Sequence, residues 1–212
     1  GNQLLYIADT GASVSLSASA DFKEYSKVTT AEYAFNRNGA MTKDLNKGIV
    51  SREGTNLRDG ISYNALNLPV EMVINNDEVK AKNYYTYTAT GTKLKVIRRY
   101  DPKGFATPLL GTTPEKDGLN PKNTTDYVGN KIYEDGVLKM ILTDNGYIEG
   151  NSYYFYIKDH LGNNRVVANA SGGAIQSNQF YPFGMAFAEG TTTEQGKQPY
   201  KYNGKELDQI HG

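Results

Sequence analysis

The chain contains no cysteine and no tryptophan, and it has only two histidines among 212 residues. Without cysteine, disulfides and thiolate metal sites are excluded, whereas the cellular compartment stays open. His160 and His211 are too few and too far apart in sequence for a metal site of the usual kind, which needs several ligands at fixed spacing. We therefore expect no metal and no cofactor.

Net charge and long apolar runs are also missing. Lys and Arg number 23, as do Asp and Glu, so no overall field attracts nucleic acid or an anionic membrane. No stretch approaches the ~20 apolar residues that a membrane-spanning helix requires. We expect neither nucleic-acid binding nor membrane insertion. The chain has no initiator methionine and no signal-peptide pattern, so we expect it to start inside a longer protein.

What is present favours short strands and tight turns. The chain has 17 tyrosines and 22 glycines, with abundant asparagine. Tyrosine favours strands and keeps a hydroxyl available to water, while glycine and asparagine tolerate the positive φ of tight turns. Hydrophobic residues make up 38%, so we expect a thin or elongated core. Residues 21–27 fit either a short helix or an irregular polar connection.

One phrase recurs along the chain. An aromatic pair at i and i+2 is followed by a step to Gly or Asn and then by an alternating run. The copies are residues 33–39, 61–67, 85–91, 154–162 and a final, shorter copy at 200–207. The pair places two rings on one face of a strand, and the Asn, Asp or Gly step supplies a turn. The repeat predicts an all-β fold of consecutive antiparallel hairpins in a wide, curved or open twisted sheet.

Residues 101–126 break this rhythm, because they hold four of the seven prolines. Proline cannot donate to a β-ladder, so we expect a surface loop inserted between repeats. The run Asp101–Gly104 is expected to form an ordinary turn there.

The C-terminal third carries a family resemblance. The succession Asp159–Val167, Tyr181–Met185 and Tyr200–Asp208 resembles the start of the RHS repeat-associated core domain, of the Bacteroidetes branch in particular. The upstream copies resemble YD repeats. The resemblance implies hairpins that build a β-sheet scaffold or shell in a large exported or surface protein, as in polymorphic toxins. The family continues into an aspartate-dependent self-cleavage motif and a variable C-terminal domain, and we expect this chain to stop before both.

We therefore expect one β-hairpin repeat domain over 1–212, with YD repeats in 1–100, the inserted loop in 101–126 and the RHS core-opening segment in 127–212. No catalytic residue is expected, and the chain is not expected to be an enzyme by itself. The residues expected to carry the structural motif are Tyr33, Phe35, Gly39, Tyr63, Tyr85, Tyr87, Gly91, Tyr154, Tyr156, Asp159, His160, Gly162, Arg165, Tyr181, Pro182, Gly184, Tyr202 and Gly204.

Three functions compete on this basis. The first is a structural module of a secreted or cell-surface RHS-type protein, whose partner is the remainder of its own longer chain. The second is a surface module that binds glycans or proteins through exposed tyrosines, although rings in repeat proteins usually pack between repeats. The third is a piece of an autoproteolytic enzyme. Because an open sheet leaves strand edges with unpaired backbone groups, we also expect a homodimer through exposed edge strands.

Overall fold

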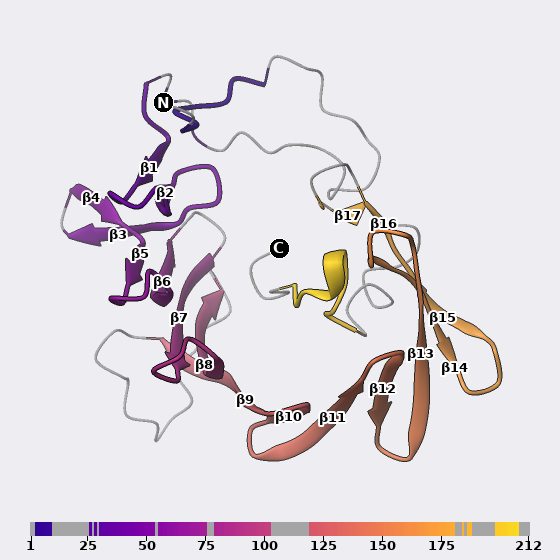
Figure 1. Ribbon diagram of the computed structural model, residues 1–212. Coiled ribbons are helices and arrows are strands. Elements are labelled where there is room, and N and C mark those ends of the chain that lie inside the picture. Colours follow the sequence, from indigo (N-terminus) through magenta and orange to yellow (C-terminus); the bar gives the residue numbers. More distant parts are fainter. Residues whose placement is uncertain are drawn as a thin grey trace. The chain divides into compact units, whose positions relative to one another are not determined.

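A computed structural model describes residues 3–9, 26, 28, 30–53, 55–75, 79–102, 119–180, 184, 186–187 and 198–207. The chain divides into two compact units, each of which is described by itself. Unit 1 comprises residues 1–10, 23–128 and 133–137, and unit 2 comprises residues 11–22, 129–132 and 138–212. Almost all the regular structure described is β, which confirms the expected fold class (Figure 1).

Seventeen strands and one short 3-10 helix follow one another along the described residues. They are β1 (Tyr33–Phe35), β2 (Met41–Asp44), β3 (Val50–Glu53), β4 (Asn56–Asp59), β5 (Ile61–Tyr63), β6 (Pro69–Asn75), β7 (Val79–Tyr87), β8 (Lys93–Pro102), β9 (Asn120–Val128), β10 (Lys131–Glu134), β11 (Val137–Thr143), β12 (Gly146–Glu149), β13 (Ser152–Lys158), β14 (Asn164–Asn169), β15 (Ala174–Ser177), β16 (Gln179–Phe180), β17 (Ala186–Phe187) and η1 (Tyr202–Gly204).

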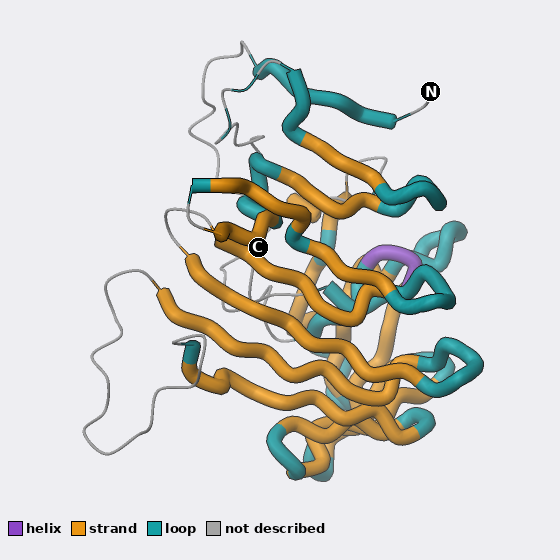
Figure 2. Tube along the Cα trace, turned by 90° about the vertical axis from the view of Figure 1, so that its left-hand side faces the viewer, coloured by secondary structure: helices purple, strands orange, loops and turns teal. Residues whose placement is uncertain are grey.

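Eleven strands form one open sheet whose order, from β15 down to β5, is the order of the sequence. Each strand therefore pairs with its neighbour in the chain, and the connections that the structure describes within this sheet are short turns, drawn in teal in Figure 2. The pairs β1–β2, β3–β4 and β16–β17 form three further two-stranded sheets. The alternating sequence explains this meander, because two strands joined by a tight turn pair at once with little loss of chain entropy.

The expected proline-rich loop over 101–126 is too wide. Strand β8 continues to Pro102 and strand β9 begins at Asn120, so both ends of that segment belong to the sheet. Pro121 lies opposite Arg99 where the register shifts, an irregular position at which a strand tolerates a residue without an N–H. Asp101 and Pro102 lie in β8 opposite Lys80 and Val79, and the remainder of the turn expected over 101–104 lies outside the described residues. Residues 103–118 lie outside the described part.

Both units have small cores. In unit 1, Ile49, Ile61, Ile74 and Ala81 are buried together, with Met72 among the partly buried residues packed against them. In unit 2, Met140, Tyr147 and Val167 are buried in strands β11, β12 and β14. Many inward positions are polar, and these need hydrogen-bond partners to be stable.

The segment 21–27, apart from Ser26, lies outside the described residues.

Candidate functional site: a buried amide cluster joined to a C-terminal hairpin

Within the described residues, five hairpins share one five-residue turn that is closed by a side chain. In each, the first residue accepts a backbone hydrogen bond from the fourth and donates one to the fifth. A side-chain oxygen of the first residue also accepts the backbone N–H of the fifth. The turns are Asn36–Ala40, Asn64–Leu68, Thr88–Thr92, Asp159–Asn163 and Asn169–Gly173. The same local sequence pattern therefore produces the same local structure in both units.

The fourth position explains the recurring glycine. Gly39, Gly91 and Gly162 have φ of 79°, 89° and 81°, in the left-handed region that side chains with a Cβ rarely adopt. Asn67 takes the same place with φ 58°, as asparagine does most readily among the other residues. The strand register shifts next to each turn, for example between Thr86 and Tyr87, which is typical of a turn that ends in a bulge.

The aromatic residues of the repeat pack inside their units. Tyr33 is buried in β1, and Tyr63 of β5 donates its hydroxyl to the Met41 carbonyl at 2.5 Å. Phe35, Tyr85, Tyr87, Tyr154 and Tyr156 are half-buried. The rings of Tyr147 and Tyr154 stack with centroids 4.7 Å apart. These rings do not form an exposed row.

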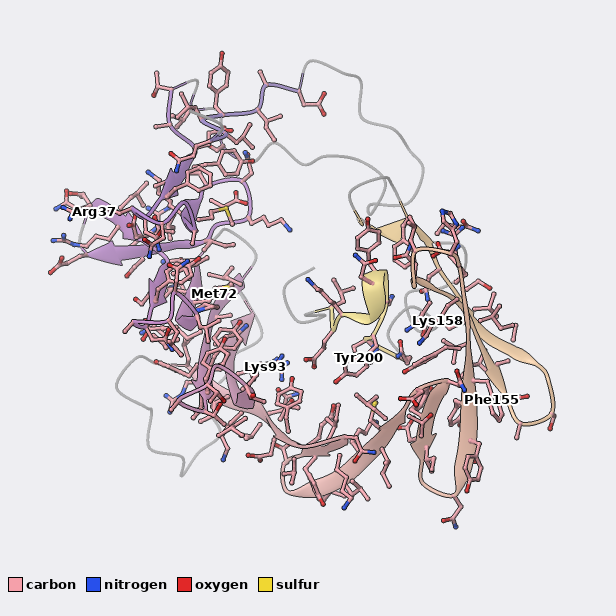
Figure 3. All side chains as sticks on the ribbon, viewed as in Figure 1. Arg37, Met72, Lys93, Phe155, Lys158 and Tyr200 are labelled. Atoms are coloured by element: carbon pink, nitrogen blue, oxygen red, sulfur yellow. The ribbon has the colours of Figure 1, made fainter. Side chains whose placement is uncertain are left out.

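Exposed rings and aliphatic groups occupy the other face of β13. Tyr153, Phe155 and Ile157 are 57%, 48% and 56% exposed. They alternate with the half-buried Tyr154 and Tyr156, as the period of a strand requires. Figure 3 labels Phe155 on this strand.

The three C-terminal motifs meet in unit 2. Arg165 lies over the Phe180 ring at 5.8 Å, and its guanidinium donates to Gln179. The Phe180 ring meets Tyr202 edge-on at 5.6 Å. A Cβ on Gly184 would lie 2.7 Å from the Tyr202 ring, so only glycine allows this approach. Tyr181 and Pro182 lie outside the described residues.

Beside this contact lies a buried amide cluster, formed by Asn164, Gln176, Asn178 and Gln198. All four are at most 2% exposed. Gln176 donates to the Asn178 side-chain oxygen at 3.0 Å, and Asn178 donates to the Asn164 carbonyl at 2.7 Å. Gln198 donates to the Tyr156 hydroxyl at 2.5 Å. A buried amide is costly unless it is hydrogen-bonded, so these bonds fix how the strands and the hairpin that holds Tyr202 fit together.

Two amide oxygens of this cluster, Asn164 Oδ1 and Gln198 Oε1, are buried without a hydrogen-bond donor in the described part of the chain. Each costs about 1–3 kcal/mol of desolvation as it stands. The cluster is therefore a place where polar groups are retained at a cost in stability.

The titratable groups near the cluster have ordinary structural roles. The pKa of Asp159 is held below its usual value, mainly by the Asn163 side chain, which donates to it at 2.8 Å. The backbone N–H groups of Asn163 and Leu161 act in the same direction. His160 is the second residue of the same turn and is exposed. Burial of Lys201 lowers the pKa of its ammonium group. The side-chain amides of the cluster do not ionise near neutral pH, so the arrangement is suited to holding chain segments together.

The described residues contain neither a metal-type cluster nor a membrane-spanning helix. There, no three His, Cys, Asp or Glu side chains converge as a metal site would require. Within the same part of the chain, no helix has the length and apolar character to cross a membrane.

Sequence reasoning missed the amide cluster. Asn163 and Asn164 lie in a motif whose aspartate, histidine and arginine are the residues expected to carry the structural role. Gln176 and Asn178 lie in a run of four polar residues, Gln176–Gln179, and such a run indicates a solvated segment. Only the burial of these residues shows that they serve a different purpose.

The fold is that of an antiparallel β-hairpin repeat. The comparison with protein families and with curated proteins yields no match. Among solved structures, a crystal structure of TcdB2-TccC3-TEV has a TM-score of 0.51 and 14% identity, covering 70% of this chain and 8% of that chain. A Photorhabdus luminescens Tc holotoxin pore with a variant TccC3 has a TM-score of 0.50 and 13% identity, covering 84% and 11%. The likeness at these identities is one of fold, and this chain spans only a small part of those chains.

Proposed function

We propose that the chain is a structural β-sheet module of a larger RHS-type protein that is exported or displayed at the cell surface. The observation that carries this proposal is the open sheet in sequence order, built from hairpins with one repeated turn. The fold shared with Tc toxin chains and the sequence resemblance to the RHS family support it. In that setting the sheet builds a scaffold or shell that encloses or presents a C-terminal effector.

The size and location of the native polypeptide test this proposal. An antibody raised against the chain should detect, in the source organism, a polypeptide much larger than 23.4 kDa in the secreted or surface fraction. A cytoplasmic polypeptide of about that mass would contradict it.

We also propose that the chain is not an enzyme by itself. In the described turn that contains Asp159 and His160, the Asp159 carboxylate accepts hydrogen bonds from Leu161 and Asn163 of the same turn. This arrangement supports a structural role for the motif. Incubation of the purified chain for several days, followed by intact-mass measurement, tests the autoproteolytic alternative. An unchanged mass agrees with the proposal, whereas a specific cleavage product overturns it.

A second candidate function is ligand binding at the exposed face of β13. Tyr153 and Phe155 present two rings on one strand face, an arrangement that can stack on sugar rings. The tyrosines of the repeat itself do not supply this surface, because they are buried or half-buried. A glycan array separates the candidates: binding lost in Tyr153→Ala and Phe155→Ala supports a lectin-like module, and an array without signal favours scaffolding alone.

A further inference from the structure

Residues 198–207 form a small hairpin with its own hydrogen bonds, here called the docking hairpin. Tyr200 pairs with Glu206, and the Lys201 N–H donates to the Lys205 carbonyl at 2.9 Å. The Leu207 N–H donates to the Pro199 carbonyl at 2.8 Å. These internal bonds define the shape in which the hairpin meets the strands of unit 2.

Six hydrogen bonds between described residues join the docking hairpin to strands β13–β15 and to the turn before β14, and five of them use the backbone of the hairpin. They are Gln198 N to Gln176 Oε1 (3.1 Å), Gln176 Nε2 to the Gln198 carbonyl (3.2 Å), Asn164 Nδ2 to the Tyr200 carbonyl (2.7 Å), Asn164 N to the Lys201 carbonyl (3.1 Å), Asn203 N to Asn163 Oδ1 (2.9 Å) and Gln198 Nε2 to Tyr156 Oη (2.5 Å). Figure 3 labels Tyr200 on this hairpin.

The surface that receives the hairpin is built for a peptide backbone. Its side-chain contacts come from Asn163, Asn164, Gln176 and Tyr156. These four residues are together called the amide receptor. A carboxamide offers both a donor and an acceptor and so complements a peptide group. Gln176 and Asn164 are themselves held by Asn178, which bonds to both residues. Asn178, which follows β15, therefore holds the receptor residues of β14 and β15 in place.

Specificity comes from two side chains of the docking hairpin. Gln198 is fully buried and bonds the receptor through its backbone and its side chain. Tyr202 packs edge-on against Phe180 and fills the space that Gly184 leaves. A hairpin with this turn and these two residues matches the receptor, whichever chain supplies it.

We propose that the amide receptor is an interaction site for a five-residue-turn hairpin and that the docking hairpin of a second copy of this chain binds it by exchange. Exchange needs no new contacts, because each backbone bond is the same in cis and in trans. The hairpin of the same chain competes at an effective concentration of roughly millimolar, so exchange is favoured when the internal hairpin is weakened.

The test uses the full chain and a fluorescent peptide of residues 198–207. The receiving chain carries Gln198→Ala, which weakens its own hairpin and leaves the receptor intact. Fluorescence anisotropy should show saturable binding to this variant and binding at least about tenfold weaker to the wild-type chain, whose hairpin occupies the site. Adding Asn164→Ala to the receiving chain should weaken binding by about tenfold as well, since the side-chain hydrogen bond to the Tyr200 carbonyl is lost while the backbone bond to Lys201 remains. A peptide with Gln198→Ala is the matched control.

Hydrogen exchange of the wild-type chain gives an independent measurement. The amides of Gln198 and Asn203 should exchange faster than the Tyr156 amide, which is bonded to Asn145 within the sheet. If Gln198→Ala prevents folding, Tyr202→Ala serves as the receiving chain. The proposal is overturned if a folded receiving chain does not bind the peptide, or if the hairpin amides exchange only together with Tyr156.

Discussion

Asp159 and the asparagines of the repeat occupy the same turn position and accept the same backbone hydrogen bonds, one through a carboxylate and the others through an amide oxygen. Asn36, Asn64 and Asn169 each accept two backbone N–H bonds from their own turns. Asp159 accepts the equivalent pair, both at 3.0 Å, and adds the bond from the Asn163 side chain. Because a carboxylate titrates and an amide does not, one of these turns should be sensitive to acid and the others should not.

Acid should loosen the Asp159 turn selectively. The pKa of Asp159 is lowered in the folded chain, so its stabilisation is complete above the ordinary value of about 3.9 and is lost as pH falls through the folded value. The NMR shifts of the Leu161 and Asn163 amides should follow this titration. Asp159→Asn should remove it while keeping the turn, and the Asn36 turn provides the internal control. Equal acid sensitivity in both turns would contradict the assignment.

At the fourth turn position, backbone conformation decides which residues are accepted. Gly39 has φ 79°, and a Cβ there would meet open space, so any cost of substitution comes from the backbone rather than from a clash. Gly39→Val should destabilise the chain by about 1–2 kcal/mol. Gly39→Asn should cost less, because Asn67 adopts this conformation in the next hairpin. Urea unfolding followed by tyrosine fluorescence measures both, and equal losses would rule out this explanation.

At the scale of elements, the hairpin of β12 and β13 is packed together by aromatic rings. Strands β12 and β13 are held together by Tyr147, which stacks on Tyr154 and lies 5.8 Å from the Tyr156 ring. Burial raises the pKa of Tyr147 well above its usual value and that of Tyr156 to about 12. The folded hairpin therefore disfavours tyrosinate on this face.

This cluster should make unit 2 sensitive to alkali. The stabilisation is fully present below the unfolded pKa of about 10 and is lost as pH rises through the higher folded values. Tyr147→Phe keeps the ring and removes the ionisable hydroxyl, so the alkaline unfolding midpoint should move to higher pH. Tyr153→Phe, at an exposed position on the neighbouring strand, is the control and should leave it unchanged. Near-ultraviolet circular dichroism during an alkaline titration measures the midpoints.

At the scale of the whole molecule, the eleven-stranded sheet is open, with β5 and β15 at its edges. An edge strand presents backbone donors and acceptors that pair readily with another strand. We predict a concentration-dependent homodimer through such an edge. Light scattering should show it in the wild-type chain, and Ile175→Lys in β15 should shift the equilibrium towards monomer, since charged residues oppose edge pairing. An unchanged distribution would exclude β15 as the contact.

The sequence by itself determined the hairpins. The aromatic pairs and the Asn, Asp or Gly steps act within a few residues, so the turns at 36–40, 64–68, 88–92 and 159–163 follow from local chemistry alone. Since each strand pairs with its neighbour along the chain, the sheet order follows as well. Local reasoning failed for Pro121, because its place in β9 depends on a register shift against β8.

Only the tertiary structure decided the candidate site. Tyr156 and Gln198 are 42 positions apart, and Asn163 and Asn203 are 40 apart, yet each pair shares a hydrogen bond. No periodicity connects residues at such distances, because the contacts arise where one hairpin packs onto another. Burial gives these polar residues their role in joining the hairpin to the strands, since an amide removed from water must find its partners inside the protein.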